Sequence, residues 1–235
     1  MTSVLVADSA AEAAQTAAAR LRAAIEDARR ARGAAHVALA GGTTPRRTYE
    51  LLAAEIADWT GVEVWFGDER AVGPDDPESN YRMVQETLQA AGGGPEVHRI
   101  EGEKGPEAAA EAYAALLTDR IPLENGLPVL DVALQGLGPD GHTASLFPGN
   151  PAVQAEGICL PVHDAPKPPP DRITLAVPVL RAARSIVFLA TGEEKADAVR
   201  RLLAGPDPAV PSSALGGDRT ELIVDRAAAP AAHSG

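Results

Sequence analysis

A glycine-rich segment, GLGPDGHTASLFPG, runs from Gly136 to Gly149 and contains one of only five histidines in the chain. Asp140 lies two residues before His142, and glycines on both sides permit tight turns. A neutral imidazole is the usual general base near pH 7, and a nearby carboxylate holds its tautomer and raises its pKa. The segment predicts that His142 acts as a base beside Asp140. A histidine that caps a short helix beside a turn aspartate is the alternative.

A second segment, GGTTP, has the composition of an anion site. Gly41, Gly42, Thr43 and Thr44 follow an apolar strand and precede a helical pattern. Backbone N–H groups at a helix N-terminus bind phosphate, and threonine hydroxyls add further donors. The same residues also fit an ordinary turn with a threonine N-cap, so both interpretations stay open.

Two cations and one acidic segment complete the set of candidate residues. Lys195 falls in the first turn of a predicted helix, where a positive charge opposes the helix dipole, and an anionic ligand explains it better than solvent does. Arg172 opens a strand, and we expect it to contact the same anion. Asp68 and Arg70 follow another strand directly. Such buried charges are costly unless they form a structural ion pair or meet a ligand.

These segments belong to a chain in which strands alternate with helices. Several strands are apolar throughout, which indicates a sheet buried on both faces. We therefore predict a doubly wound α/β fold, Rossmann-like, with a mostly parallel sheet flanked by helices. Ligands of such sheets bind at the carboxyl ends of the strands, where the candidate loops fall. Strands are expected over 35–40, 62–69, 96–100, 128–135, 157–162, 172–177, 185–191 and 221–225, and helices over 10–32, 46–56, 78–91, 106–121 and 193–205.

The domain prediction is one unit over residues 1–226, followed by a disordered tail over 227–235. The 136–149 loop is expected to open a short helix. The net charge of −12 argues against nucleic acid and anionic membranes as partners. A single cysteine, Cys159, and no apolar run long enough to span a membrane or act as a signal peptide predict a cytoplasmic protein.

Common hydrolytic motifs are missing from the sequence. It has no G-x-S-x-G, H-E-x-x-H or C-x-x-C segment, and the histidines at 36, 98, 142, 163 and 233 show no metal-ligand spacing. We therefore expect neither a serine nucleophile nor a catalytic metal.

Four segments in this order, ALAGGTTP, WFGDERAVGPDDPESNYRM, LQGLGPDGHTASLFPG and PPPDRITLAVPVL with ATGEEKADAV, resemble the 6-phosphogluconolactonases. The resemblance spans roughly residues 36–200. It implies hydrolysis of 6-phosphoglucono-1,5-lactone to 6-phosphogluconate in the oxidative pentose phosphate pathway, without a metal or an organic cofactor. AGGTTP replaces the S-G-G-S-T-P of many members and keeps the hydroxyls.

Glucosamine-6-phosphate deaminases share this fold, and their matching segment resembles G-H-x-A-F-N-E-P. Phe147 stands where they have the glutamate, which argues against aldose–ketose chemistry. On the lactonase interpretation His142 is the base and Arg70 stabilises the oxyanion, and Asp68 or Asp140 orients these groups. Gly41, Gly42, Thr43, Thr44, Arg172 and Lys195 hold the phosphate. A non-catalytic sugar-phosphate sensor is the second class considered, and the chain is expected to be a monomer or a small homo-oligomer.

Overall fold

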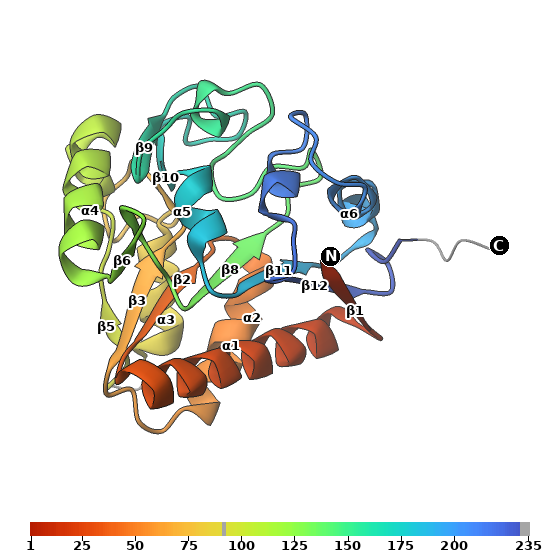
Figure 1. Cartoon of the computed structure of the whole chain (residues 1–235), viewed down its shortest axis with the longest axis horizontal. Helices are drawn as coiled ribbons and strands as arrows, with labels where there is room; N and C mark the ends of the chain where they lie inside the picture. Colours follow the sequence, from red (N-terminus) through yellow and green to blue (C-terminus); the bar gives the residue numbers. More distant parts are fainter. Residues whose placement is uncertain (91–92, 231–235) are drawn as a thin grey trace.

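The core of the molecule is a seven-stranded parallel sheet with the strand order β1-β12-β11-β8-β2-β3-β5 (Figure 1). The structure is a computed structural model that describes residues 1–90 and 93–230. Strands β2 and β11 are buried along their whole length, as the apolar sequence predicts. The strands are β1 (Ser3–Ala7), β2 (Ala35–Leu39), β3 (Val62–Phe66), β5 (Glu96–Val97), β8 (Val132–Gly136), β11 (Ile186–Ala190) and β12 (Thr220–Asp225).

Helices cover both faces of this sheet. From β2 the chain continues to β3 and β5, and from β8 it continues the other way to β11 and β12. Right-handed crossovers therefore place the helices of the two halves on opposite faces, with α1–α3 below and α4–α6 above in Figure 1. The helices are α1 (Ala10–Arg32), α2 (Thr43–Glu55), α3 (Asn80–Leu88), α4 (Pro106–Arg120), α5 (Val177–Ala182) and α6 (Ala196–Leu203). The predicted doubly wound α/β fold is confirmed.

Helix α1, the longest of these helices, shows how the local sequence sets where a helix begins and ends. The Ser9 side chain accepts a hydrogen bond from the Glu12 N–H and caps α1, and Gly33, at φ 79°, ends it. One cluster of buried apolar side chains extends from Ala7 to Ala228 among the described residues. Within those residues, no helix combines the length and apolarity that crossing a bilayer requires.

Two small sheets and four 3₁₀ turns complete the fold. Strand β10 (Arg172–Leu175) lies between β4 (Asp68–Arg70) and β9 (Cys159–Val162), antiparallel to both. Strands β6 (Leu123–Glu124) and β7 (Leu127–Pro128) form a hairpin. The 3₁₀ turns are Gly102–Lys104, Pro151–Val153, Glu193–Lys195 and Pro211–Leu215.

Several predicted elements differ from the structure. The strand expected over 62–69 divides at Gly67, whose N–H donates to the Leu39 carbonyl. Its second part is β4, which joins the small antiparallel sheet. The strand expected over 172–177 belongs to the same small sheet, as β10. The short helix expected within 136–149 is wrong, because Gly141 and Ala144 adopt positive φ angles of 89° and 48°. Strand β1 and helix α5 were not predicted at all.

Two predicted segments reach beyond the described residues. The helix expected over 78–91 is α3, and residue 91 lies outside the description. Of the tail expected over 227–235, residues 231–235 also lie outside it. Residues 227–230 follow β12, and there Ala228 is buried and donates its N–H to Asp225 Oδ1.

Candidate active site

A cavity of about 360 Å³ opens where the strand order reverses, at the carboxyl ends of β2 and β8. These neighbouring strands pair through Val37 with Val132 and Ala38 with Ala133, and the chain leaves them in opposite directions. Such a switch point forms a crevice in an open α/β sheet. The walls contain every predicted site residue except Asp140: Gly41, Gly42, Thr43, Thr44, Asp68, Arg70, His142, Arg172 and Lys195.

The loop between β2 and α2 presents free backbone donors to this cavity. Gly42, at φ 97°, is the N-cap of α2, and no side chain caps the helix. Gly41 passes so close to α3 that an added Cβ would lie 1.9 Å from Asn80 Oδ1. The Tyr49 hydroxyl donates to the Ala40 carbonyl at 2.7 Å and ties α2 to the end of β2. The first turn of α2 lacks acidic residues, so its unpaired N–H groups suit an anion.

Three cations face the cavity without a carboxylate partner. No carboxylate oxygen of the described residues lies within 4.0 Å of Arg172, Lys167 or Lys195. Arg172 is only 6 % exposed, and burial lowers its pKa; burial also lowers the pKa of Lys195. Buried positive charge without a partner is costly, and an anion in the cavity would offset that cost.

Backbone carbonyls fix the orientation of the Arg172 side chain. Its guanidinium donates to the carbonyls of Lys167, Pro168 and Pro169 at 3.0, 3.3 and 3.1 Å. On β4, Arg70 is the direct cross-strand neighbour of Arg172. Like charges in such a position repel each other, so negative charge on a bound ligand would stabilise the pair.

Arg70 has only part of its hydrogen-bonding capacity used. Its Nη1 donates to the Glu78 carbonyl and lies 3.6 Å from the Glu78 carboxylate, while its buried Nε has no partner among the described residues. The side chain is 19 % exposed and lines the cavity. It can therefore still donate to a ligand.

His142 is held by the loop after β8. Its Nδ1 lies 2.5 Å from Asp140 Oδ1, and the Asp140 carboxylate also accepts from the His142 backbone N–H at 3.2 Å. Gly138 is required here, because an added Cβ would lie 2.0 Å from the His142 Nδ1. With Nδ1 bound to a carboxylate, the proton resides on Nδ1 and the Nε2 lone pair is free, which is the tautomer that a base needs.

The pKa of His142 is lowered from its usual value of 6.5, chiefly because the ring is buried. Asp140 opposes this effect and Lys167 adds to it. Asp140 raises this pKa, as predicted, but desolvation outweighs the carboxylate, so the expected net increase is wrong. The imidazole is neutral at pH 7.

Asp68 belongs to a different network from the histidine. Its carboxylate accepts from the Ser145 hydroxyl at 2.6 Å and lies 3.4 Å from Asn80 Nδ2, which also donates to the Asp68 carbonyl at 2.9 Å. It makes no hydrogen bond to His142 in the described part of the chain. Of the two carboxylates that the sequence left open, Asp140 is the one that contacts the imidazole.

Phe147 lines the cavity beside His142 and Arg172. It is 3 % exposed, its ring centroid lies 4.6 Å from that of His142, and the Arg172 guanidinium lies 5.6 Å from the same centroid. This apolar ring packs against both groups and supplies no ionisable group to the cavity.

Sequence reasoning missed three polar or charged side chains of the cavity wall. Lys167 lies in a proline-rich stretch without a helical or strand period that would show its direction. Asn80 and Glu78 enter the cavity from the start of α3. Their position depends on Glu69, whose buried carboxylate accepts from the N–H groups of Asn80 and Tyr81 at 2.8 and 2.9 Å.

The sequence profile of the family described as glucosamine-6-phosphate isomerases/6-phosphogluconolactonase matches residues 8–224. The chain belongs to this family. The 6-phosphogluconolactonase of Streptomyces coelicolor is 43 % identical over 232 residues, with 92 % of this chain and 89 % of that protein covered.

Two solved structures are also similar. The 6-phosphogluconolactonase from Trypanosoma brucei has a TM-score of 0.87 at 29 % identity, with 97 % of both chains covered. A monomeric glucosamine-6-phosphate deaminase has a TM-score of 0.80 at 25 % identity, with 97 % of this chain and 98 % of that chain covered. The fold is thus shared by proteins named for two different reactions, and the side chains in the cavity must distinguish them.

The effect of Asp140 on the pKa of His142 can be tested by comparing the unchanged protein with Asp140→Asn. Asp140→Asn removes the charge that raises the His142 pKa, so the imidazole should titrate even lower than in the unchanged protein. NMR titration of the ring protons measures this shift. His163 is the internal control, since Asp171 and Glu107 raise its pKa and Asp140 does not contact it. A His142 pKa above 6.5, or one insensitive to Asp140→Asn, would contradict the geometry.

Proposed function

We propose that this protein hydrolyses 6-phosphoglucono-1,5-lactone to 6-phosphogluconate in the cytoplasm, as a step of the oxidative pentose phosphate pathway. One observation carries the proposal: a neutral histidine held by Asp140 faces the same cavity as an uncapped helix N-terminus and three unpartnered cations. A general base for water and an anion anchor lie within one ligand-sized space. The 6-phosphogluconolactonases among its relatives support the same assignment.

The reaction requires a base, a water molecule and positive charge near the carbonyl oxygen. His142 Nε2 takes a proton from water as its oxygen bonds to C1 of the lactone. Arg70 donates to the developing oxyanion. The C1–ring oxygen bond then breaks, and the ring oxygen receives the proton from the imidazolium. Asp140 stays ionised and stabilises the imidazolium that forms between these two steps.

The phosphate anchor is built from other residues that line the same cavity as the base. Thr43 and Thr44 N–H groups, with Arg172 and Lys195, would hold the 6-phosphate at the end of β2. Lys167 lines the same cavity and adds a further cation. Binding energy from this remote group can position C1 against His142 and so lower the activation barrier.

Phe147 favours lactone hydrolysis over the reaction of the glucosamine-6-phosphate deaminases. A deaminase of this fold has a glutamate at the matching place for proton transfer during ring opening. Here that place is apolar and buried, close to both His142 and Arg172. No observation favours the sensor alternative, which would need the phosphate anchor but not the Asp140–His142 pair.

The anchor is tested with Lys195→Ala. Losing one charge-assisted contact costs about 1.5–3 kcal/mol, so 6-phosphogluconate should bind about 10- to 150-fold more weakly. Calorimetric titration measures this, and gluconate without the phosphate should be unaffected. Lys104→Ala is the matched control, because Lys104 pairs with Glu101 and does not line the cavity. Equal weakening for both ligands would show that Lys195 does not bind the phosphate.

The base is tested with His142→Ala. This variant should lower kcat by about 10²–10⁴-fold, the range for loss of a general base, and should leave 6-phosphogluconate affinity nearly unchanged. In the wild type, kcat should rise with pH through an ionisation below 6.5, since burial lowers the pKa of this base. Spontaneous lactone opening is subtracted at each pH.

His163→Ala is the control for this base, because His163 is a half-exposed histidine outside the cavity. It should keep full activity. If His142→Ala retains most of its kcat, or loses product affinity in step with activity, then the histidine is not the base.

A further inference from the structure

A second cluster of titratable side chains lies at the amino ends of the strands, opposite the cavity. His36, Glu63 and Glu96 are direct neighbours across β2, β3 and β5, since His36 pairs with Glu63 and Glu63 pairs with Glu96. Side chains of paired residues project from the same face of a sheet. His98 follows Glu96 by two residues, and its ring meets the Glu63 and Glu96 carboxylates, with His36 next to Glu63.

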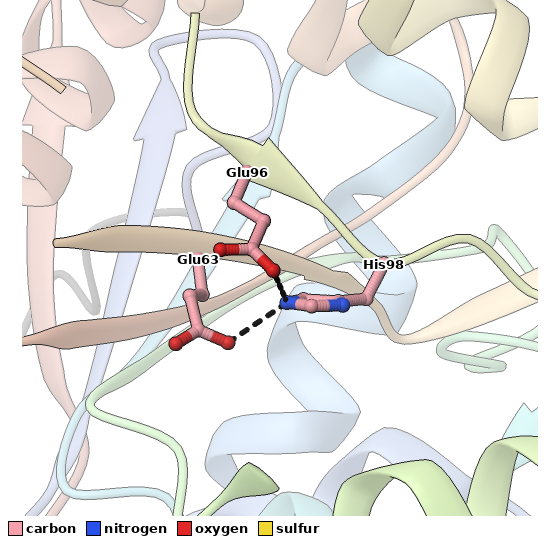
Figure 2. Close-up of side chains that lie close together, drawn as sticks. All are labelled: Glu63, Glu96 and His98. Carbon is pink, nitrogen blue, oxygen red and sulfur yellow. Dashed lines mark hydrogen bonds and ion pairs between the residues drawn. The ribbon is translucent and has the colours of Figure 1, made fainter. Parts of the chain in front are cut away.

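The distances within this cluster fit a metal ion. His98 Nε2 lies 2.8 Å from Glu63 Oε2 and 3.4 Å from Glu96 Oε1 (Figure 2), and the three donor atoms lie within 4.8 Å of one another. Zinc ligands at ~2.0–2.1 Å in a tetrahedron are separated by ~3.3 Å. The three donors therefore need only small movements to share one ion.

His36 supplies an independent indication of a missing ligand. The His36 side chain is only 9 % exposed, and its buried Nδ1 has no hydrogen-bond partner among the described residues. This nitrogen lies 3.9 Å from Glu63 Oε2, the same oxygen that His98 contacts. A buried nitrogen left unpaired is unusual and costly, and a shared ion would satisfy it.

Two carboxylates directly opposite each other also need a cation. Arg120 provides one, with its Nη2 2.8 Å from Glu96 Oε1 and 3.4 Å from Glu63 Oε2. Its side chain is 39 % exposed, so the guanidinium can move into solvent when another cation binds. Arg120 is therefore a competitor of a metal at this place and not an obstacle to it.

We propose that His36, Glu63, Glu96 and His98 form a zinc-binding site at the end of the sheet remote from the catalytic cavity. Two imidazoles with two carboxylates are a donor set that Zn²⁺ accepts in tetrahedral geometry. The ion would join β2, β3 and β5 at their amino ends and would stabilise the fold by binding only the folded state. The proposal is independent of the lactonase assignment.

Trp65 reports on this site directly. Its ring stacks on His98 with centroids 4.1 Å apart at an interplanar angle of 20°. A bound paramagnetic ion such as Co²⁺ should quench its fluorescence. The test titrates the chelator-treated full chain with Zn²⁺ by calorimetry and with Co²⁺ by absorption and fluorescence. We expect one ion per chain, tetrahedral Co²⁺ bands, quenched tryptophan emission and a higher Tm with zinc.

Glu96→Gln is the deciding variant, because Glu96 is 56 % exposed and the substitution preserves its shape. Zinc binding should weaken by more than ~100-fold, since even losing a group that only orients a ligand costs ~10–100-fold. Glu124→Gln is the matched control: Glu124 is 55 % exposed and also pairs with an arginine, Arg184. It should bind zinc as the wild type does.

Two more variants separate zinc binding from an ordinary ion cluster. Arg120→Ala should tighten zinc binding, because the competing cation is gone. His142→Ala should not change it. The proposal is overturned if the wild type binds no zinc, if Glu96→Gln binds it unchanged, if Arg120→Ala weakens it, or if His142→Ala abolishes it.

Discussion

The pairing of β2 with β8 is the constraint on which the rest of the site depends. These strands lie side by side although almost a hundred residues separate them, and each continues to a different half of the sheet. Their divergence opens the crevice. It places an uncapped helix N-terminus after one strand and the Asp140–His142 turn after the other. The candidate anion site and the candidate base therefore line one cavity.

Charge is distributed unevenly along the strands of this acidic protein. The carboxyl ends carry Arg70, Lys167, Arg172 and Lys195 around one cavity. The amino ends carry the Glu63 cluster, which consists of His36, Glu63, Glu96 and His98. Each end keeps like charges close together and compensates them only in part, through Arg120 at the amino ends and Glu78 at the carboxyl ends, so an ion of opposite sign would add stability. The sheet thus resembles a scaffold with a place for an anion at one end and a cation at the other.

Much of this arrangement could be predicted from the sequence. Apolar strands alternating with helices indicate a parallel sheet, and the rule that ligands bind at its carboxyl ends brings Gly42, Arg70 and His142 together. Contacts that depend on register could not be predicted. The pairing of Arg70 with Arg172 arises in a small antiparallel sheet too short to leave a pattern.

The Glu63 cluster escaped sequence reasoning for the same reason. His36, Glu63 and Glu96 are far apart along the chain, and only the parallel register makes them neighbours. The spacing of the histidines therefore gave no sign of a ligand set. The direction of the His142 pKa was also predicted wrongly, because the number of atoms that cover a ring cannot be read from its sequence neighbours.

We propose that one ligand spans the crevice, with its phosphate at the end of β2 and its carboxyl carbon at the end of β8. A crystal structure of the protein with 6-phosphogluconate tests this directly. We expect the phosphate oxygens within hydrogen-bond distance of the Thr43 and Thr44 N–H groups and of Lys195. The carboxylate should lie beside His142 Nε2 and Arg70. A ligand bound in the reverse direction, or outside this cavity, would contradict the account.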